Sequence, residues 1–597
     1  MFKLLKYLKP YFWQITLLLI LIFVSVETTL QLPDYMAKIV NDGIVAQNNS
    51  VVIHTGALML LVALLGAAAT IGIGYFSSRI GTGFSKDIRE KVFSKVESFS
   101  LVEFNKFSTA SLITRSTNDI QQIQIVLILI LRMVLQAPIM GVGAIFKAYH
   151  TAPSMSWIII LAVTIMMGII FVLFSIALPK FTLLQKLVDK LNLVTRQNLT
   201  GLRVIRAFNN EKLEESKFEK ANVDLTNANL FVNRLMVFMQ PVITLVFNFT
   251  ALGIIWVGAH LIGSGNLQIG DMIAFMQYAM QVIISFLMVS IVFIMVPRAA
   301  VSANRVMEVI GTKPVIRNPK KAQKPEKSTG LVEFKDVTFS YKAADSPVLS
   351  KISFTAKPGE TTAFIGSTGS GKSTLINLIP RFYDATKGQI LIDNIDVRNY
   401  KLEDLYAKIG YVPQKGVLFS GTVASNIKYG APDLTKTELE KAASISQSGE
   451  FIKGLENSYD HPIAQGGTNV SGGQKQRLSI ARAIARKPEI YIFDDSFSAL
   501  DFTTDAKLRQ ALSHETKHKT VLVVAQRIST ILSADKIIVL DEGKIVGVGT
   551  HKELMKSCEV YREIAYSQLS EQELKDYQIG LDEKILTKAL PREGGAK

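Results

Sequence analysis

The chain has 597 residues, more than one ordinary hydrophobic core accommodates, so two or more domains are expected. Its single cysteine, Cys558, excludes an internal disulfide framework and a multi-cysteine metal site, which suits a protein that faces the cytoplasm. The formal charge of +16 could indicate a nucleic-acid partner, but residues 331–597 carry 35 basic against 33 acidic side chains. The basic excess therefore lies in the first 330 residues, where it predicts loops at an anionic membrane surface and no nucleic acid.

The chain begins with MFKLLKYLKPY, in which Lys3, Lys6 and Lys9 alternate with apolar residues. This pattern predicts a short helix at the membrane interface. No small-residue cleavage site follows the next apolar run, so we expect an uncleaved membrane span rather than a secretory signal.

Six apolar stretches are long enough to cross a bilayer, which takes about 20 residues each. The connections after the second and fourth stretches are long and rich in Lys and Arg, which places them and both termini on the cytoplasmic side of the cytoplasmic membrane. The stretches are approximately Phe12–Leu32, Val52–Phe76, Ile125–Phe146, Trp157–Leu178, Val242–Ile262 and Met272–Val296.

Both long connections keep apolar residues at helical spacing and contain few helix breakers. We therefore expect the spanning helices to extend well past the membrane surface and to turn near Phe104–Ser111 and near Ala207–Glu211. Helix hairpins of this kind are suited to contact a soluble domain.

The composition changes at residues 311–330, which are rich in Pro and Lys and mark a domain boundary. We assign residues 1–310 to a helical transmembrane domain, 311–330 to a linker, 331–570 to a soluble domain and 571–597 to a C-terminal tail. In the soluble domain, the β-type runs VEFKDVTF, GQILID, EIYIF, TVLVVA and KIIVLDEGKIV alternate with helical runs, which predicts an α/β fold with a largely parallel sheet.

The segment TTAFIGSTGSGKST fits the phosphate-binding pattern G-x-x-x-x-G-K-[ST] between an apolar strand and a helix. Backbone N–H groups and the helix N-terminus would hold phosphates, Lys372 would reach the outer ones, and the Ser373 hydroxyl would hold Mg²⁺. The strand and helix around the pattern make a chance match improbable. The predicted ATP ligands here are Gly366, Ser367, Thr368, Gly369, Ser370, Gly371, Lys372, Ser373 and Thr374.

Two further segments point to the same chemistry. Asp494 ends the buried run IYIFD, where an aspartate supports Mg²⁺. The segment Ser471, Gly472, Gly473, Gln474 opens a helical run and offers a hydroxyl and N–H groups for a second phosphate-binding surface. A chain with two such surfaces suggests a dimer that sandwiches nucleotide at its interface.

Together these motifs resemble the ATP-binding-cassette exporter family, as a half-transporter with six membrane helices and one nucleotide-binding domain, over about residues 1–570. The matching segments are the P-loop, VSGGQ at 470–474, Asp494, SALD at 498–501, the glutamine of YVPQ (Gln414) and the aromatic residue of FSY (Tyr341). The resemblance implies that Tyr341 stacks on adenine. It also implies that Gln414 senses Mg²⁺ and the γ-phosphate, and that Ser471, Gly472 and Gly473 bind ATP held by a partner's P-loop.

Two positions depart from the family pattern. The catalytic Glu that follows the strand acid is replaced by Asp495, and the switch histidine is replaced by Gln526. A carboxylate about 1 Å short of its water can cost on the order of 100-fold in rate, and a Gln cannot carry a positive charge. A milder departure is Ala464–Gly467, where the family often has a Glu. Sequence drift could explain one such change. Asp495 and Gln526 both affect the hydrolysis step, however, and together they predict a site that binds ATP and hydrolyses it slowly.

With these departures, the chain resembles the degenerate-site subunit of a bacterial heterodimeric multidrug exporter, which implies a second half-transporter as partner. Glu27 and Arg132 within the spans are expected to be paired or at headgroup level, and Gln240, Asn248, Gln277 and Gln281 could line a cavity for amphipathic compounds. A lipid or peptide flippase and an ATP-gated regulator or channel without active transport stay open as alternatives.

Overall fold

The structure is a computed structural model that describes residues 2–342 and 344–569. The predicted tail at 571–597 lies outside the described residues. The chain divides into two compact units. The helical unit comprises the residues up to Glu97 and Phe107–Thr312, and the α/β unit comprises Ser98–Lys106 and the residues from Lys313 onward.

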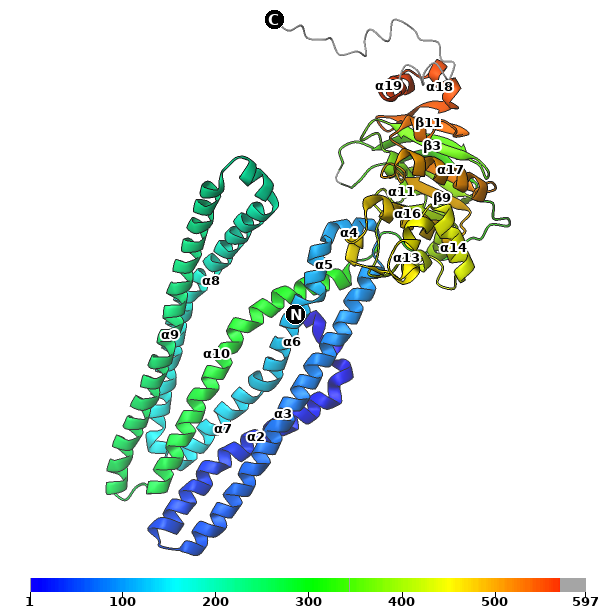
Figure 1. Ribbon diagram of the computed structural model, residues 1–597. Coiled ribbons are helices and arrows are strands. Elements are labelled where there is room, and N and C mark those ends of the chain that lie inside the picture. Colours follow the sequence, from blue (N-terminus) through cyan, green and yellow to red (C-terminus); the bar gives the residue numbers. More distant parts are fainter. Residues whose placement is uncertain (1, 343, 570–597) are drawn as a thin grey trace, which may run out of the picture. The chain divides into compact units, whose positions relative to one another are not determined.

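The helical unit contains six helical segments long and apolar enough to cross a membrane, which confirms the six predicted spans. Figure 1 shows its long helices running alongside one another, with residues 156–263 as a helix hairpin that separates from the others toward one end. The helices are α1 (Phe2–Leu5), α2 (Phe12–Lys38), α3 (Asn49–Glu97), α5 (Thr109–Ser116), α6 (Asn118–Leu129), α7 (Gln136–Thr151), α8 (Ser156–Ala207), α9 (Glu211–Gly263) and α10 (Ile269–Gly311), with short 3₁₀ or π turns at 6–11, 39–45, 130–134 and 153–155.

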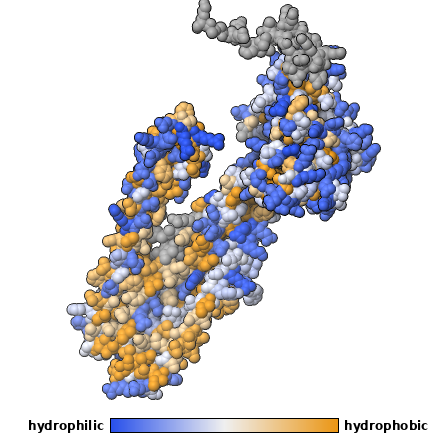
Figure 2. Space-filling model, viewed as in Figure 1, coloured by the Kyte–Doolittle hydropathy of each residue, from blue (hydrophilic) through white to orange (hydrophobic). Residues whose placement is uncertain are grey.

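Four of these helices, α10 with its 43 residues among them, are far longer than a membrane is thick. Helices α3, α8 and α9 have 49, 52 and 53 residues, whereas about 20 suffice to span a bilayer. Their apolar parts expose large side chains such as Ile71 and Trp256, and Figure 2 shows the hydrophobic surface that results. Such exposure is stable against lipid or a second subunit, and the residues in excess of the roughly 20 that span a bilayer extend these helices beyond the membrane.

The α/β unit is built on two sheets. The six-stranded sheet has the order β12-β11-β3-β10-β9-β6, in which only β12 is antiparallel to its neighbour. Strands β9 and β10 are buried along their whole length, as expected for parallel strands covered on both faces. The strands are β3 (Thr361–Gly366), β6 (Ile409–Val412), β9 (Ile490–Asp494), β10 (Thr520–Val524), β11 (Lys536–Asp541) and β12 (Lys544–Gly549).

Two of the runs that we assigned to the parallel sheet belong instead to a separate antiparallel sheet, of order β2-β1-β4-β5. The run VEFKDVTF forms β1, and most of GQILID forms β4. The physical reason is visible in β1, where buried positions alternate with partly exposed ones, as in a sheet with one face on the core. Its strands are β1 (Val332–Phe339), β2 (Leu349–Ala356), β4 (Lys387–Ile392) and β5 (Ile395–Asp396).

Helices cover the sheets of the α/β unit. They include α11 (Lys372–Leu378), α15 (Gly449–Lys453), α16 (Gly472–Ala485), α17 (Phe502–Glu515), α18 (His551–Ser557) and α19 (Glu559–Gln568), and most of α4 (Leu101–Phe107) also belongs to this unit. The others are α12 (Leu402–Ala407), α13 (Val423–Lys428) and α14 (Lys436–Ile445), with a two-stranded ribbon of β7 (Gly421–Thr422) and β8 (Pro462–Ile463) and short 3₁₀ turns, one of which spans Ile528–Thr530.

The predicted linker is not a free tether, because its backbone is hydrogen-bonded along the α/β unit. Arg381 donates to the carbonyl of Arg317 (3.1 Å), and the side chain of Asn318 accepts from the backbone N–H of Leu402 (2.8 Å). These contacts give the Pro- and Lys-rich segment, which has no core of its own, a fixed course over the unit.

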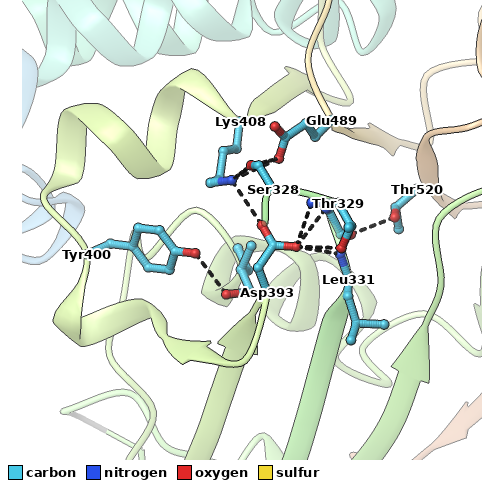
Figure 3. Close-up of polar contacts among 10 residues, drawn as sticks. Ser328, Thr329, Leu331, Asp393, Tyr400, Lys408, Glu489 and Thr520 are labelled. Atoms are coloured by element: carbon cyan, nitrogen blue, oxygen red, sulfur yellow. Dashed lines mark hydrogen bonds and ion pairs between the residues drawn. The ribbon is translucent and has the colours of Figure 1, made fainter. Parts of the chain in front are cut away.

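The linker ends in a polar network centred on Asp393 (Figure 3). One carboxylate oxygen of Asp393 accepts from the backbone N–H groups of Thr329 (3.1 Å), Gly330 (2.7 Å) and Leu331 (3.1 Å), and the other accepts from Lys408 (2.9 Å). Lys408 also pairs with Glu489 at 2.9 Å. Burial acts to raise the pKa of Asp393, but the hydrogen bonds from Lys408 and Thr329 outweigh it and hold the pKa below its usual value.

We expect the substitution Asp393→Ala to lower the free energy of unfolding of the α/β unit by about 3 kcal/mol near neutral pH, since it leaves three backbone donors without their acceptor and takes from Lys408 one of its two carboxylate partners. Because the folded-state pKa is depressed, the carboxylate stabilises the fold above its unfolded pKa of about 3.9, and this stabilisation is lost as the pH falls through the lower folded-state pKa. The difference in the free energy of unfolding between the variant and the wild type should therefore become smaller at acidic pH.

Urea-dependent hydrogen exchange of β1 and β4 in the detergent-solubilised chain measures this difference. Asp433→Ala, at an exposed site of the same unit, is the control. An equal loss in both variants would contradict a specific role for Asp393.

Candidate functional site

The P-loop lies between β3 and α11, where two glycines have specific backbone roles. A side chain on Gly366 would collide with the carbonyl of Leu540 on the neighbouring strand β11. Gly371 has a φ of +97°, and its absent Cβ would lie 2.7 Å from the side chain of Leu349. Both positions therefore require glycine, and the turn that they permit directs backbone N–H groups toward one point.

Lys372 begins α11 and folds back into the loop. Its ammonium donates to the carbonyls of Gly366 (2.9 Å) and Ser367 (2.8 Å) and to the hydroxyl of Ser370 (3.3 Å). Burial lowers the pKa of Lys372, and the nearby carboxylates of Asp495 and Asp494 oppose that shift. The cation is thus preorganised at the loop, where partial burial strengthens its attraction for an anionic ligand.

Ser373 and Asp494 form a pair of oxygen ligands beside the loop. The Ser373 hydroxyl donates to Asp494 Oδ1 at 3.0 Å. Burial raises the pKa of Asp494, and the bond from Ser373 counteracts the rise. The described residues contain no group of three or more His, Cys, Asp or Glu side chains that could hold a metal ion by themselves. This donor set fits Mg²⁺, which takes one or two protein oxygens and completes its shell with water and phosphate.

Asp495 is the centre of the next layer of the site. Its Oδ2 accepts from Gln414 Nε2 at 3.1 Å and from Gln526 Nε2 at 2.8 Å. Its φ of +47°, uncommon for a residue other than glycine, is held by a bond from its N–H to the carbonyl of Val524 (3.0 Å). Burial raises the pKa of Asp495, while the bonds from Gln414 and Ser498 act in the opposite direction.

The two residues that depart from the family pattern therefore contact each other. Asp495 and Gln526 lie 31 positions apart in the sequence and share one hydrogen bond. The structure also brings Gln414 to the same carboxylate oxygen, so the three predicted catalytic positions form one cluster.

Tyr341, the predicted adenine contact, lies at the edge of the loop. Its hydroxyl is 3.1 Å from the hydroxyl of Thr374, and the residue as a whole is 37% exposed. Sequence reasoning missed Tyr383, whose ring meets Tyr341 edge-on with centroids 5.4 Å apart and whose hydroxyl accepts from Asn105 of α4 at 3.3 Å. The only local signal was a pair of aromatic residues, Phe382 and Tyr383, shortly after the P-loop helix.

The segment Ser471–Gln474 forms the exposed N-terminus of α16. Ser471 and Gln474 cap the helix reciprocally, at 3.3 Å and 2.9 Å. A Cβ on Gly472 would meet no atom within 4 Å, so the start of the helix is open. In the described part of the chain, the side-chain hydrogen bonds of Ser471 and Gln474 stay within this turn, and none joins them to the chain's own P-loop.

Comparisons with known proteins agree with these motifs. Residues 15–286 match the model of the ABC transporter transmembrane region, and residues 349–498 match that of the ABC transporter family. An uncharacterized ABC transporter ATP-binding protein of Mycobacterium tuberculosis is 43% identical over 94% of this chain and 97% of its own length. An ATP-dependent lipid A-core flippase of Aromatoleum aromaticum is 31% identical over 96% of each protein.

The fold also matches a solved structure, that of a bacterial Atm1-family ABC exporter with ATP bound. The TM-score is 0.79 at 25% identity, and the match covers 94% of this chain and 99% of the other. One transmembrane domain followed by one ATP-binding domain is thus shared along nearly the whole length. The chain belongs to the ABC transporters, as an exporter half-transporter whose ATP-binding domain couples ATP hydrolysis to transport.

Proposed function

We propose that this chain exports amphipathic or lipid-like compounds across the cytoplasmic membrane as one half of a heterodimeric transporter, and that its own ATP site holds nucleotide rather than hydrolysing it rapidly. The observation that carries this proposal is the single carboxylate oxygen of Asp495 that accepts from both Gln414 and Gln526.

In this proposal, the P-loop backbone and Lys372 bind the phosphates of ATP, and Tyr341 stacks on adenine. Ser373, Asp494 and Gln414 would hold Mg²⁺, which when bound neutralises charge on the phosphates. Thr374 would fix the ring of Tyr341 through the hydroxyl contact at 3.1 Å. Binding of Mg²⁺ and ATP thus needs none of the positions that depart from the family pattern.

Hydrolysis needs a base or orienting group for water and a donor toward the γ-phosphate. The carboxylate of Asp495 is one methylene shorter than that of Glu, and two amides already occupy one of its oxygens. The amide of Gln526 is uncharged at any pH, so it cannot supply the positive charge of an imidazolium. An offset of about 1 Å alone can lower the rate on the order of 100-fold.

A partner subunit gives the exposed end of α16 its role. The open space at Gly472 and the unengaged N-terminus of the helix suit a phosphate from another chain. We infer that Ser471, Gly472 and Gly473, with Gln474 capping the helix, complete the partner's ATP site, while the partner's equivalent segment covers this P-loop. Both long cytoplasmic extensions and both termini would face the same side.

Amphipathic or lipid-like cargo fits the helical unit. Gln281 of α10 donates to the carbonyl of Thr29 at 3.5 Å, while its own buried Oε1 accepts no hydrogen bond from any described residue. A buried acceptor among apolar helices offers a polar contact to a mostly apolar molecule. The flippase relatives act, by their names, on lipid A-core, which favours a lipid-like cargo.

The double substitution Asp495→Glu with Gln526→His should raise ATP hydrolysis at this site by about tenfold or more, because it lengthens the carboxylate and restores an ionisable donor. Phosphate release by the purified transporter measures the effect, and Asp495→Asn with Gln526→His serves as control because it lacks the carboxylate. Unchanged hydrolysis in the first variant would contradict a limitation at Asp495 and Gln526.

Purification with and without the product of the neighbouring reading frame tests the heterodimer. We expect the pair to hydrolyse ATP and to move a fluorescent dye or a labelled lipid in proteoliposomes, and the chain alone to bind ATP with little turnover. A homodimer with brisk hydrolysis would exclude the heterodimeric assignment.

The substitution Gly472→Asp should leave the chain folded, since the new side chain enters open space. It should nevertheless abolish most ATP turnover of the assembled transporter, by placing a negative charge where the partner's phosphate would bind, while ATP binding at this chain's P-loop persists. Gly449→Asp, at the first position of α15, is the matched control. Equal turnover in both variants would contradict the role of α16.

A further inference from the structure

The switch residue Gln526 is held from behind by the C-terminal helix. The side chain of Gln568, the last residue of α19, donates from Nε2 to the carbonyl of Gln526 and accepts at Oε1 from the N–H of Ile528, both at 2.8 Å. The side-chain amide of Gln568 thus forms hydrogen bonds with the backbone on both sides of Arg527, and we call this pair of bonds the clamp. We propose that Gln568 is a positioning residue for the switch position 526, and that α19 thereby sets the geometry of the ATP site.

The backbone after Ala525 needs this support because its neighbouring strand, β3, ends there. The parallel ladder between β10 and β3 continues as far as the N–H of Ala525, which donates to the carbonyl of Phe364 at 3.1 Å. Two residues further on, β3 becomes the P-loop at Gly366. The Gln568 amide then takes the place of the N–H and C=O that one residue of a neighbouring parallel strand would present, bonding the carbonyl of one residue and the N–H of the second residue after it.

Helix α19 is anchored firmly enough to act as a support. Tyr561, Ala565 and Leu569 follow one another at four-residue spacing and are all buried. The hydroxyl of Tyr561 also lies 2.8 Å from Nδ1 of His551 in α18. A fixed helix end holds the Gln568 amide in place, and the main chain at residue 526 determines where the side chain of Gln526 meets Asp495.

This inference rests on the proposed role of Asp495 and Gln526, so its test has one arm that does not depend on hydrolysis. Hydrogen exchange at the Ile528 amide, measured on the full-length transporter, reports the clamp directly. Gln568→Ala should accelerate exchange there by about tenfold or more. Gln568→Glu keeps an acceptor for Ile528 but puts an oxygen against the carbonyl of Gln526, so it should retain most of the protection.

The second arm uses the variant Asp495→Glu/Gln526→His, with Mg²⁺ and ATP as probes. In that background both Gln568→Ala and Gln568→Glu should lower kcat by about tenfold with little change in KM for ATP. When position 526 carries Gln526→Ala instead, Gln568→Ala should have no further effect on kcat. Ser567→Ala, an exposed neighbour whose hydroxyl bonds only within its own helix, is the control.

The outcomes separate the two proposals. Unchanged exchange at Ile528 in Gln568→Ala, or an equal loss of kcat whether or not position 526 has been truncated to alanine, would overturn the role of Gln568. If Asp495→Glu/Gln526→His shows no gain in hydrolysis while the exchange effect is present, the proposed impairment of the site fails and the clamp stands.

Discussion

The carboxylate of Asp495 is the point on which the rest of the ATP site depends. It is buried, it follows the last residue of a fully buried strand, and one of its oxygens accepts from the amides of Gln414 and Gln526. A buried carboxylate requires donors, and here the two donors come from two segments of the chain that lie far from Asp495 and from each other in the sequence. The hydrogen bonds that oppose the rise in the pKa of Asp495 on burial also occupy its carboxylate, which links the stability of the site to its reactivity.

Much of the architecture follows from local patterns. The six spans, their long extensions and the core strands could be predicted because continuous apolar runs and helical spacing leave few alternatives in lipid or in a parallel sheet. The antiparallel sheet of β1 and β4 could not, since the choice of partner strand is a long-range property. The alternation of apolar and polar residues in VEFKDVTF indicates a strand with one exposed face, but it does not reveal that this strand pairs with β2 and β4 in a second sheet.

The candidate site shows the same division. The P-loop, Asp494 and the segment at Ser471 are read from short contiguous patterns whose spacing follows from backbone geometry. The contact between Asp495 and Gln526 spans 31 positions, and the clamp from Gln568 to Gln526 spans 42. Contacts over such separations depend on how the strands and helices pack, which a single sequence does not reveal. Tyr383 and its bond to Asn105 were missed for this reason.

The assignment of Ser98–Lys106 to the α/β unit has a consequence for where its domain boundary lies. Glu103 is buried there and accepts from the backbone N–H of Val315 at 3.1 Å, and Asn105 donates to Tyr383. The α/β unit that binds ATP is therefore built from two segments that lie far apart in the sequence. A protein expressed from residue 313 onward would lack one of its own segments and would expose the backbone donor of Val315 to water. The stability and ATPase activity measured on such a fragment would be those of an incomplete α/β unit, not of the unit as it is built in the transporter.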